Sequence, residues 1–360
     1  MNQNIKKEIL DLSQKLVEVE STKSNPQGLK EVIGIAKKYL PSFKYFEFEK
    51  NNYPSIFFYN FLPKDKKFKL ILNGHLDVVS GKKEQFNLVD KGKYLFGRGS
   101  SDMKCGVAVQ MCVLKILATK NRNPIGLQLV TDEEIGGNDG TLFQLKKGIS
   151  SEFAISGEST DLKINNTSKG VFWFKLTAKG KSSHGAYLWN GKNALRKLLV
   201  AVNRITKVFE EPTKEVWKTT CNLAFIKTAN ETPNKVPDLA EAVFDIRYVP
   251  LDKKIIVKKI KKLIPKGIKL DILEFEPSPL TSKKNKYVKK LITSITKIKG
   301  NKVSFQKAHG ASDIRHFEKH RINGICFGPI GFGLHSDNEY IDKKSLFDFY
   351  LILEDFIKSL

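Results

Sequence analysis

The sequence predicts an α/β fold: a domain with a mixed sheet covered by helices, interrupted by an inserted α+β domain. Three observations support this prediction. The chain has 360 residues, which exceeds the size at which a single hydrophobic core usually stops growing. Short apolar runs alternate with helical patterns over residues 1–168, as in sheets flanked by helices. The pattern changes near Lys169, and the alternation resumes after Pro277.

The first part begins with an amphipathic helix in the opening 20 residues, and two apolar runs that predict buried strands follow, "SIFFYNF" and "KLILNGHLDVV". The stretch "SDMKCGVAVQMCVLKILAT" predicts a helix because its apolar residues recur at helical spacing. "IGLQLVTDEE" and "FAISGES" are further short apolar runs that end in acidic residues. In such sheets, ligands bind outside the carboxyl ends of the strands.

Residues 169–277 carry a different order of elements. Strands are predicted for "GVFWFKLTAKG", "CNLAFIKT", "AEAVFDIRYV" and "IKLDILEFEP", and helices for "NALRKLLVAVNRITKVFEE" and "KKIIVKKIKKLI". The resulting order, βαββαβ, is that of a ferredoxin-like domain. We therefore expect residues 1–168 and 278–360 to form one domain and residues 169–277 to form the insertion.

The composition limits the partners and the location of the protein. The net charge of +24 raises the hypothesis of nucleic-acid binding. However, the lysines are spread along the chain, and only seven of the 62 basic residues are Arg, the side chain preferred for base and phosphate recognition. We therefore expect no specific nucleic-acid partner. The sequence has no apolar run of 18 residues and no leader, which predicts a cytoplasmic protein without membrane association. Its cysteines form no CxxC pair, which predicts reduced thiols.

Residue types that bind metals occur at or near the ends of five predicted elements. They are His75 and Asp77, Asp102, Glu133 and Glu134, Glu158, and His335. Each has an ordinary interpretation when taken alone: Asp102 suits a helix N-cap, and the adjacent Glu133 and Glu134 suit a solvated turn. Together, two histidines and three carboxylates are the ligands that a two-cation site with mixed nitrogen and oxygen donors requires.

Seven motifs carry a resemblance to a known family. "HLDVV", "GRGSSDMKCG", "DEEIGG", "GES", "SSHGA", "HGASDIRHF" and "HSDNEYI" resemble, in order, motifs of the acetylornithine deacetylase, succinyl-diaminopimelate desuccinylase and carboxypeptidase G family of zinc metallopeptidases. The resemblance extends from about Leu72 to Ile341. It implies a catalytic domain with an inserted ferredoxin-like lid that also dimerises, which agrees with the order of elements above.

The resemblance also implies a dinuclear centre with two zinc ions per subunit. Asp102 would bridge the ions, with a cis peptide to Met103. His75 and Glu158 would complete one set of protein ligands, and Glu134 and His335 the other. Asp77 would orient the imidazole of His75 from behind. Cobalt or manganese can bind to the same ligands.

Further roles follow from the same resemblance. Glu133 would face the metal-bound water as general base and pass its proton to the leaving amine. His184 would stabilise the oxyanion in the partner's active site, which implies a homodimer. Substrate contacts are expected from the carboxylate-binding Arg247, from Asn234, and from the loop with Gly310 and Ser312.

Two departures from the family pattern lie in the lid. "SSHGAYLWNGKNAL" lacks the proline that often follows the lid histidine, and "KTANETPNKVPD" has bulkier residues in place of glycines. We expect hydrolysis of the amide bond of a small N-acyl amino acid, of the succinyl-diaminopimelate desuccinylase or acetylornithine deacetylase type. A carboxypeptidase or dipeptidase acting on short peptides is the alternative. A polyanion-binding protein on an inactive hydrolase scaffold is more remote, because it predicts a missing ligand or base and all are present.

Overall fold

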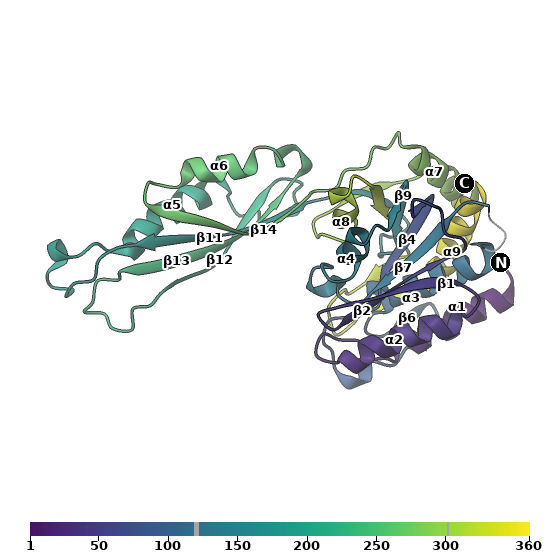
Figure 1. Cartoon of the computed structure of the whole chain (residues 1–360). Helices are drawn as coiled ribbons and strands as arrows, with labels where there is room; N and C mark the ends of the chain where they lie inside the picture. The colour runs from purple at the N-terminus through teal and green to yellow at the C-terminus, as the bar shows by residue number, and fades with distance from the viewer. Residues whose placement is uncertain (119–121, 301) are drawn as a thin grey trace. The chain divides into compact units, whose positions relative to one another are not determined.

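Figure 1 shows a computed structural model of the chain that describes residues 1–118, 122–300 and 302–360. The chain divides into two compact units. The first comprises Met1–Thr167, Leu280–Lys307 and Ser312–Leu360, and the second comprises Ser168–Pro279 and Ala308–Ala311. The insertion expected at residues 169–277 lies inside the second unit, which also includes the short stretch before Ser312.

The first unit is built on an eight-stranded mixed sheet, in agreement with the predicted fold class. Its strands, in spatial order, are β1 (Lys44–Lys50), β2 (Tyr53–Tyr59), β7 (Ile125–Val130), β4 (Leu70–His75), β9 (Phe153–Ser156), β16 (Asn323–Cys326), β10 (Ile164–Ser168) and β15 (Phe305–Ala308). The central strands β7, β4, β9 and β16 run parallel to one another, whereas β1, β2 and β10 pair antiparallel. The carboxyl ends of the central strands therefore meet at one edge of the sheet.

The central strands are apolar along most of their length because both faces of the sheet are covered. Every residue of β4 and of β7 is buried, which explains why these strands are mostly apolar and show no regular alternation of apolar and polar residues. Among the described residues, the α-helices of this unit are α1 (Gln3–Val17), α2 (Pro26–Tyr39), α3 (Cys105–Val113), α4 (Thr141–Lys146), α7 (Lys286–Lys299), α8 (Ile314–Lys319) and α9 (Lys343–Lys358). Helices α1, α3, α7 and α9 contribute to one large apolar cluster with the sheet.

A second, smaller sheet joins distant parts of the chain. Its order is β17 (Gly331–Phe332), β18 (Tyr340–Asp342), β6 (Tyr94–Phe96) and β5 (Val89–Lys91). Strand β18 pairs antiparallel with β6, so the loop between β17 and β18 is held beside the segment that follows β6. Two further short strands, β3 (Lys67–Phe68) and β8 (Ser150–Ser151), form a separate parallel pair.

The second unit has the predicted ferredoxin-like order. In the chain, β11 (Gly170–Lys179), α5 (Ala194–Val208), β12 (Thr220–Thr228), β13 (Leu239–Tyr248), α6 (Ile256–Leu263) and β14 (Ile268–Glu276) follow one another. The antiparallel sheet has the order β12-β13-β11-β14, and Figure 1 shows α5 and α6 on one of its faces. That face carries the apolar core of the unit, including Phe174, Phe244 and Ile246.

Within the described residues, no helix has both the length and the apolar character that a bilayer crossing requires. All four cysteines are free thiols, and three of them, Cys105, Cys112 and Cys326, are buried.

Candidate active site

The strand ends of the main sheet bring the predicted site residues of the first unit together. His75 is the last residue of β4, Glu158 lies two residues beyond β9, and Glu133 begins a short turn after β7. Because these strands are parallel neighbours, the three side chains lie at the same edge. The cluster also contains Asp77, Asp102, Glu134 and His335.

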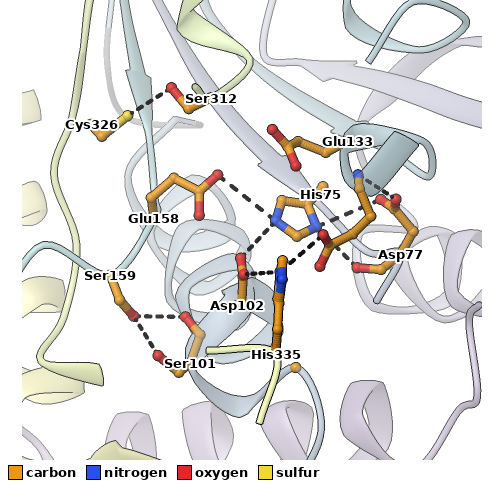
Figure 2. A network of polar contacts seen from close by, with 12 residues as sticks. His75, Asp77, Ser101, Asp102, Glu133, Glu158, Ser159, Ser312, Cys326 and His335 are labelled. Atoms are coloured by element: carbon orange, nitrogen blue, oxygen red, sulfur yellow. Dashed lines mark hydrogen bonds and ion pairs between the residues drawn. The ribbon is translucent and has the colours of Figure 1, made fainter. Parts of the chain in front are cut away.

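The segment with Asp102 differs from the helix predicted for it. Residues Ser100–Lys104 form an irregular turn in which Asp102 is extended (φ −125°, ψ 89°), and α3 begins only at Cys105. Asp102 therefore does not cap the helix. The cis peptide implied by the resemblance is present between Asp102 and Met103. The turn directs Asp102 toward both histidines of the cluster (Figure 2).

Two groups of three potential ligands share Asp102. In the first, Nε2 of His75 lies 3.1 Å from Oδ1 of Asp102 and 3.8 Å from Oε1 of Glu158. In the second, Nε2 of His335 lies 3.2 Å from Oδ2 of Asp102 and 3.1 Å from Oε2 of Glu134. The ligand atoms of each group all lie within 4.8 Å of one another. Asp102 thus presents one oxygen to each histidine, as a bridging carboxylate would.

Asp77 orients both groups from behind. Nδ1 of His75 lies 3.0 Å from the backbone oxygen of Asp77. A carbonyl can only accept, so Nδ1 donates and Nε2 is left to face the carboxylates. The Asp77 carboxylate is farther from this ring, with Oδ1 3.6 Å from Nδ1, and its Oδ2 accepts the backbone N–H of Glu134 at 3.0 Å. The imidazole is thus oriented by the backbone of Asp77 at the shorter distance, while the carboxylate positions Glu134.

The electrostatics of the cluster suit divalent cations. Burial, and then the charges of Asp102 and Glu133, raise the pKa of Glu158 well above its usual value. Contacts with Asp102 and Glu134 raise the pKa of His335 to about 10. These buried carboxylates therefore attract positive charge, and the proton on His335 lies where a cation would bind. The donor set, imidazole nitrogen with carboxylate oxygen, fits zinc, cobalt or manganese.

Glu133 lies in the cluster but outside both ligand groups. With Glu134 it occupies a 3₁₀ turn, Glu133–Ile135, and not the end of the strand itself. Its Oε1 lies 3.6 Å from Nη1 of Arg315. Burial raises the pKa of Glu133 to about 8, while the charges of His75 and Arg315 act in the opposite direction. The adjacent glutamates thus have different environments, since Glu134 contacts His335.

Helix α8 holds this turn in place. Nη2 of Arg315 and Nε2 of His316 both donate to the backbone oxygen of Gly136, at 2.7 and 2.9 Å. Burial lowers the pKa of His316 to about 2, so its ring remains neutral. At Gly137 (φ 62°), a Cβ atom would lie 2.1 Å from Oδ1 of Asp313. Glycine is therefore required there for the backbone conformation and for the close approach of α8.

Glu339 is a site residue that the sequence did not reveal. Its buried carboxylate accepts the backbone N–H groups of Gly99, Ser101 and Asp102 at 3.0, 2.9 and 3.0 Å, and pairs with Arg98 at 2.8 Å. It therefore fixes the turn that carries Asp102. Its place four residues after His335, in the motif "HSDNEYI", was the available signal.

The remaining predicted residues lie elsewhere in the chain. His184 and Asn234 belong to the second unit and are neighbours there, because Gly185 N–H donates to the Asn234 carbonyl at 2.5 Å. Arg247, on β13, forms a bidentate ion pair with Asp245, in which its Nε and Nη2 donate to the carboxylate oxygens at 2.9 to 3.2 Å. Gly310 falls in the second unit and Ser312 in the first, where its hydroxyl lies 3.1 Å from Sγ of Cys326.

Comparisons with known proteins identify the family. The sequence profile of Peptidase family M20/M25/M40 matches residues 71–359. The chain is 27% identical to succinyl-diaminopimelate desuccinylase of Sulfurimonas denitrificans over 97% of its own length and 99% of the relative's. It is 33% identical to a probable carboxypeptidase of Talaromyces marneffei over 48% of this chain and 40% of that protein. The crystal structure of an aminopeptidase from Bacillus cereus shares the fold, with a TM-score of 0.78, 18% identity and 98% of each chain covered. The chain belongs to Peptidase family M20/M25/M40 and is a hydrolase of amide bonds.

Proposed function

We propose that the first unit is a two-cation catalytic domain. His75, Asp102 and Glu158 would hold one ion, and Asp102, Glu134 and His335 the other, with zinc as the metal. The observation that carries this proposal is that Asp102 presents a different oxygen to each histidine. When bound, the cations would lower the pKa of a water molecule towards neutrality and polarise the scissile carbonyl.

Glu133 is the general base in this proposal. It is buried beside the two ligand groups without belonging to either, so its carboxylate can take the proton of the attacking water and pass it to the leaving amine. Burial raises the pKa of Glu133, and the positive charges of His75 and of Arg315, 3.6 Å away, act against burial in favour of the ionised form that a base requires. The two bonds from α8 to the Gly136 carbonyl fix the turn and therefore the position of this carboxylate.

The proposed substrate is a small N-acyl amino acid, as in succinyl-diaminopimelate desuccinylase and acetylornithine deacetylase. The full-length similarity to the Sulfurimonas denitrificans desuccinylase supports this choice. Arg247 is the proposed contact for a substrate carboxylate, with Asn234, Gly310 and Ser312 as further contacts. Because Asp245 occupies the fork of Arg247, a substrate carboxylate would have to replace or share that partner.

A peptidase acting on short peptides is the second candidate. The description of the matching family and the similarity to the probable carboxypeptidase favour it. The ligand groups and Glu133 serve both reactions, because each breaks an amide bond by attack of water.

The second unit is proposed to act as a lid and to form a homodimer. His184 is exposed, and it is followed by three exposed apolar residues, Tyr187, Leu188 and Trp189, with exposures of 52%, 57% and 77%. Burial of these side chains against a second copy would remove apolar surface from water. We propose that His184 then contacts the oxyanion in the partner's active site. No specific nucleic acid and no membrane take part in this proposal, and the cytoplasm is the proposed location.

The test is hydrolysis by the zinc- or cobalt-loaded protein, across succinyl-diaminopimelate, acetylornithine, acyl-glutamates, dipeptides and tripeptides. Glu133→Ala should reduce kcat by about 100-fold to 10,000-fold, the usual contribution of a general base, while both metals stay bound. Glu84→Ala, which removes an exposed glutamate, is the matched control and should be fully active. Normal turnover by Glu133→Ala would exclude the proposed base, and the preferred substrate would separate the two candidates.

A further inference from the structure

A cavity of about 460 Å³ lies beside Glu134 in the first unit. Four segments of the chain form it: the residues after α1, the start of β2, the residues after β4 and the turn after β7. Glu134 and Asp77 are among its lining residues, so it adjoins the proposed cation site directly. Its volume is in the range of small-molecule sites. None of the roles described above uses this space.

The lining combines two kinds of surface. Val78, Val79 and Ile135 provide apolar wall, whereas the hydroxyls of Thr22, Ser24, Tyr53, Ser80 and Thr131 provide polar groups. Those of Tyr53 and Ser80 form no hydrogen bond with the residues that the structure describes. An apolar wall with free donors suits a short aliphatic chain that ends in a hydrogen-bond acceptor.

Among its described residues, the lining offers one unpaired cation to an anionic end group. Of the two lining carboxylates, Glu134 contacts His335 and Oδ2 of Asp77 accepts the N–H of Glu134, whereas the buried Oδ1 of Asp77 has no hydrogen-bond partner among the described residues. Lys23 is the one basic residue in the lining, and it forms no side-chain hydrogen bond or ion pair within the described part of the chain. By contrast, Lys82, which lies outside the lining, is paired with Asp337 at 2.7 Å.

We infer that this cavity is a subsite for a carboxylate of the substrate, with Lys23 as its counter-ion. The inference rests on the proposed function and names a part of the substrate. The carboxylate has two possible sources, the far end of a dicarboxylic acyl group and the amino-acid side of the amide. Tyr53 supports the assignment as a donor, because burial and the charges of Asp132, Asp139 and Asp77 raise its pKa and keep its proton in place.

Binding of succinate and butanoate tests the subsite without turnover. The two acids have the same chain length, but only succinate has a second carboxylate, so contacts of the first carboxylate with the cations cancel in the ratio of the two dissociation constants. Lys23 is exposed, so in Lys23→Met this ratio should shift against succinate by about 2-fold to 5-fold, as expected for an ion pair at the surface. Lys23→Arg should restore most of the preference. Lys30→Met, which removes an exposed lysine outside the cavity, should leave it unchanged.

Turnover distinguishes the two sources of the carboxylate. One arm compares N-succinyl with N-butanoyl amino acids, and the other compares a free amino-acid carboxylate with its carboxamide. A loss of selectivity by Lys23→Met in the first arm assigns the cavity to the acyl group, and a loss in the second arm assigns it to the amino-acid side. Unchanged selectivity in binding and in both arms would overturn the inference, even if the parent protein hydrolyses these amides. Lys23-dependent succinate binding without hydrolysis would instead retain the subsite and reject the proposed function.

Discussion

Asp102 is the residue on which both ligand groups depend. Each of the other four proposed ligands belongs to one group of three, whereas Asp102 belongs to both groups and has its two oxygens 3.1 and 3.2 Å from Nε2 of His75 and of His335. A change at Asp102 should therefore affect two bound ions at once, and a change at an outer ligand should affect one.

We expect Asp102→Ala to lose both cations and His335→Ala to lose one. Metal analysis after dialysis of the folded proteins measures this directly, with circular dichroism as the check on folding. Asp337→Asn, an exposed change two residues from His335, is the control and should retain the parental content. Two ions retained by Asp102→Ala would contradict the bridging role.

Glu339 should affect the metal affinity of the site without itself contacting a cation. Glu339→Gln keeps the shape of the side chain but removes the charge that Arg98 and three backbone N–H groups share. Because the turn with Asp102 loses its anchor, we expect metal affinity to fall by about 10-fold to 100-fold, as for other residues that orient metal ligands. Competition with a chromogenic chelator measures the affinity. An unchanged affinity in a folded Glu339→Gln protein would show that the turn is fixed by other contacts.

Among the elements, Glu152 links the amino-terminal end of β9 to α7. It lies just before β9, and its carboxylate accepts hydrogen bonds from Lys286 and from the hydroxyl of Tyr287, at 2.7 and 2.6 Å. Lys69 contacts it at 3.1 Å. The hydrogen bonds of Lys286 and Tyr287 lower the pKa of Glu152 to about 2.

This lowered pKa gives the link a defined pH dependence. The stabilisation is complete above the unfolded-state pKa, near 4.5, and is lost as the pH falls through about 2. Glu152→Gln should therefore lower the free energy of unfolding at pH 7 by about 1 kcal/mol, a value reduced for the partial exposure of the pair. The difference between the two proteins should shrink in denaturant titrations as the pH falls below 4.5. A difference that is constant down to pH 3 would assign the effect to packing.

Elements differ in how well the sequence predicts them. Strands β4 and β7 were predictable because buried parallel strands are apolar along most of their length, and the second unit was predictable because its six elements have clear periodicity. The turn Ser100–Lys104 was not, because the helical spacing of apolar residues continues through it. Strands of two or three residues, such as β17 and β18, are too short for a period. The role of Glu339 was hidden because it consists of bonds to backbone N–H groups, which any residue provides.

At the scale of the whole molecule, the proposed dimer makes each active site depend on two chains. His184→Ala alone should lower kcat while metal content stays at the parental level. In a mixture of refolded His184→Ala and Glu133→Ala chains, each mixed dimer would contain one site with an intact Glu133 and the partner's intact His184. We expect activity to reappear in the mixture, although each parent variant is impaired. Activity equal to the average of the two variants would show that His184 does not act between chains.

The small sheet has a consequence for how the centre comes into being. Asp102 lies in the turn after β6, while His335 and Glu339 lie in or next to the loop that β18 holds beside it. During synthesis on the ribosome, a nascent chain that ends at β16 would already contain His75, Asp102, Glu134 and Glu158, but neither the second histidine nor the carboxylate that fixes the turn. The capacity to bind two cations should therefore arise late and in one step, after residue 339 has left the exit tunnel. Until then, the proposed metal site would lack His335 and Glu339 and could not hold both ions.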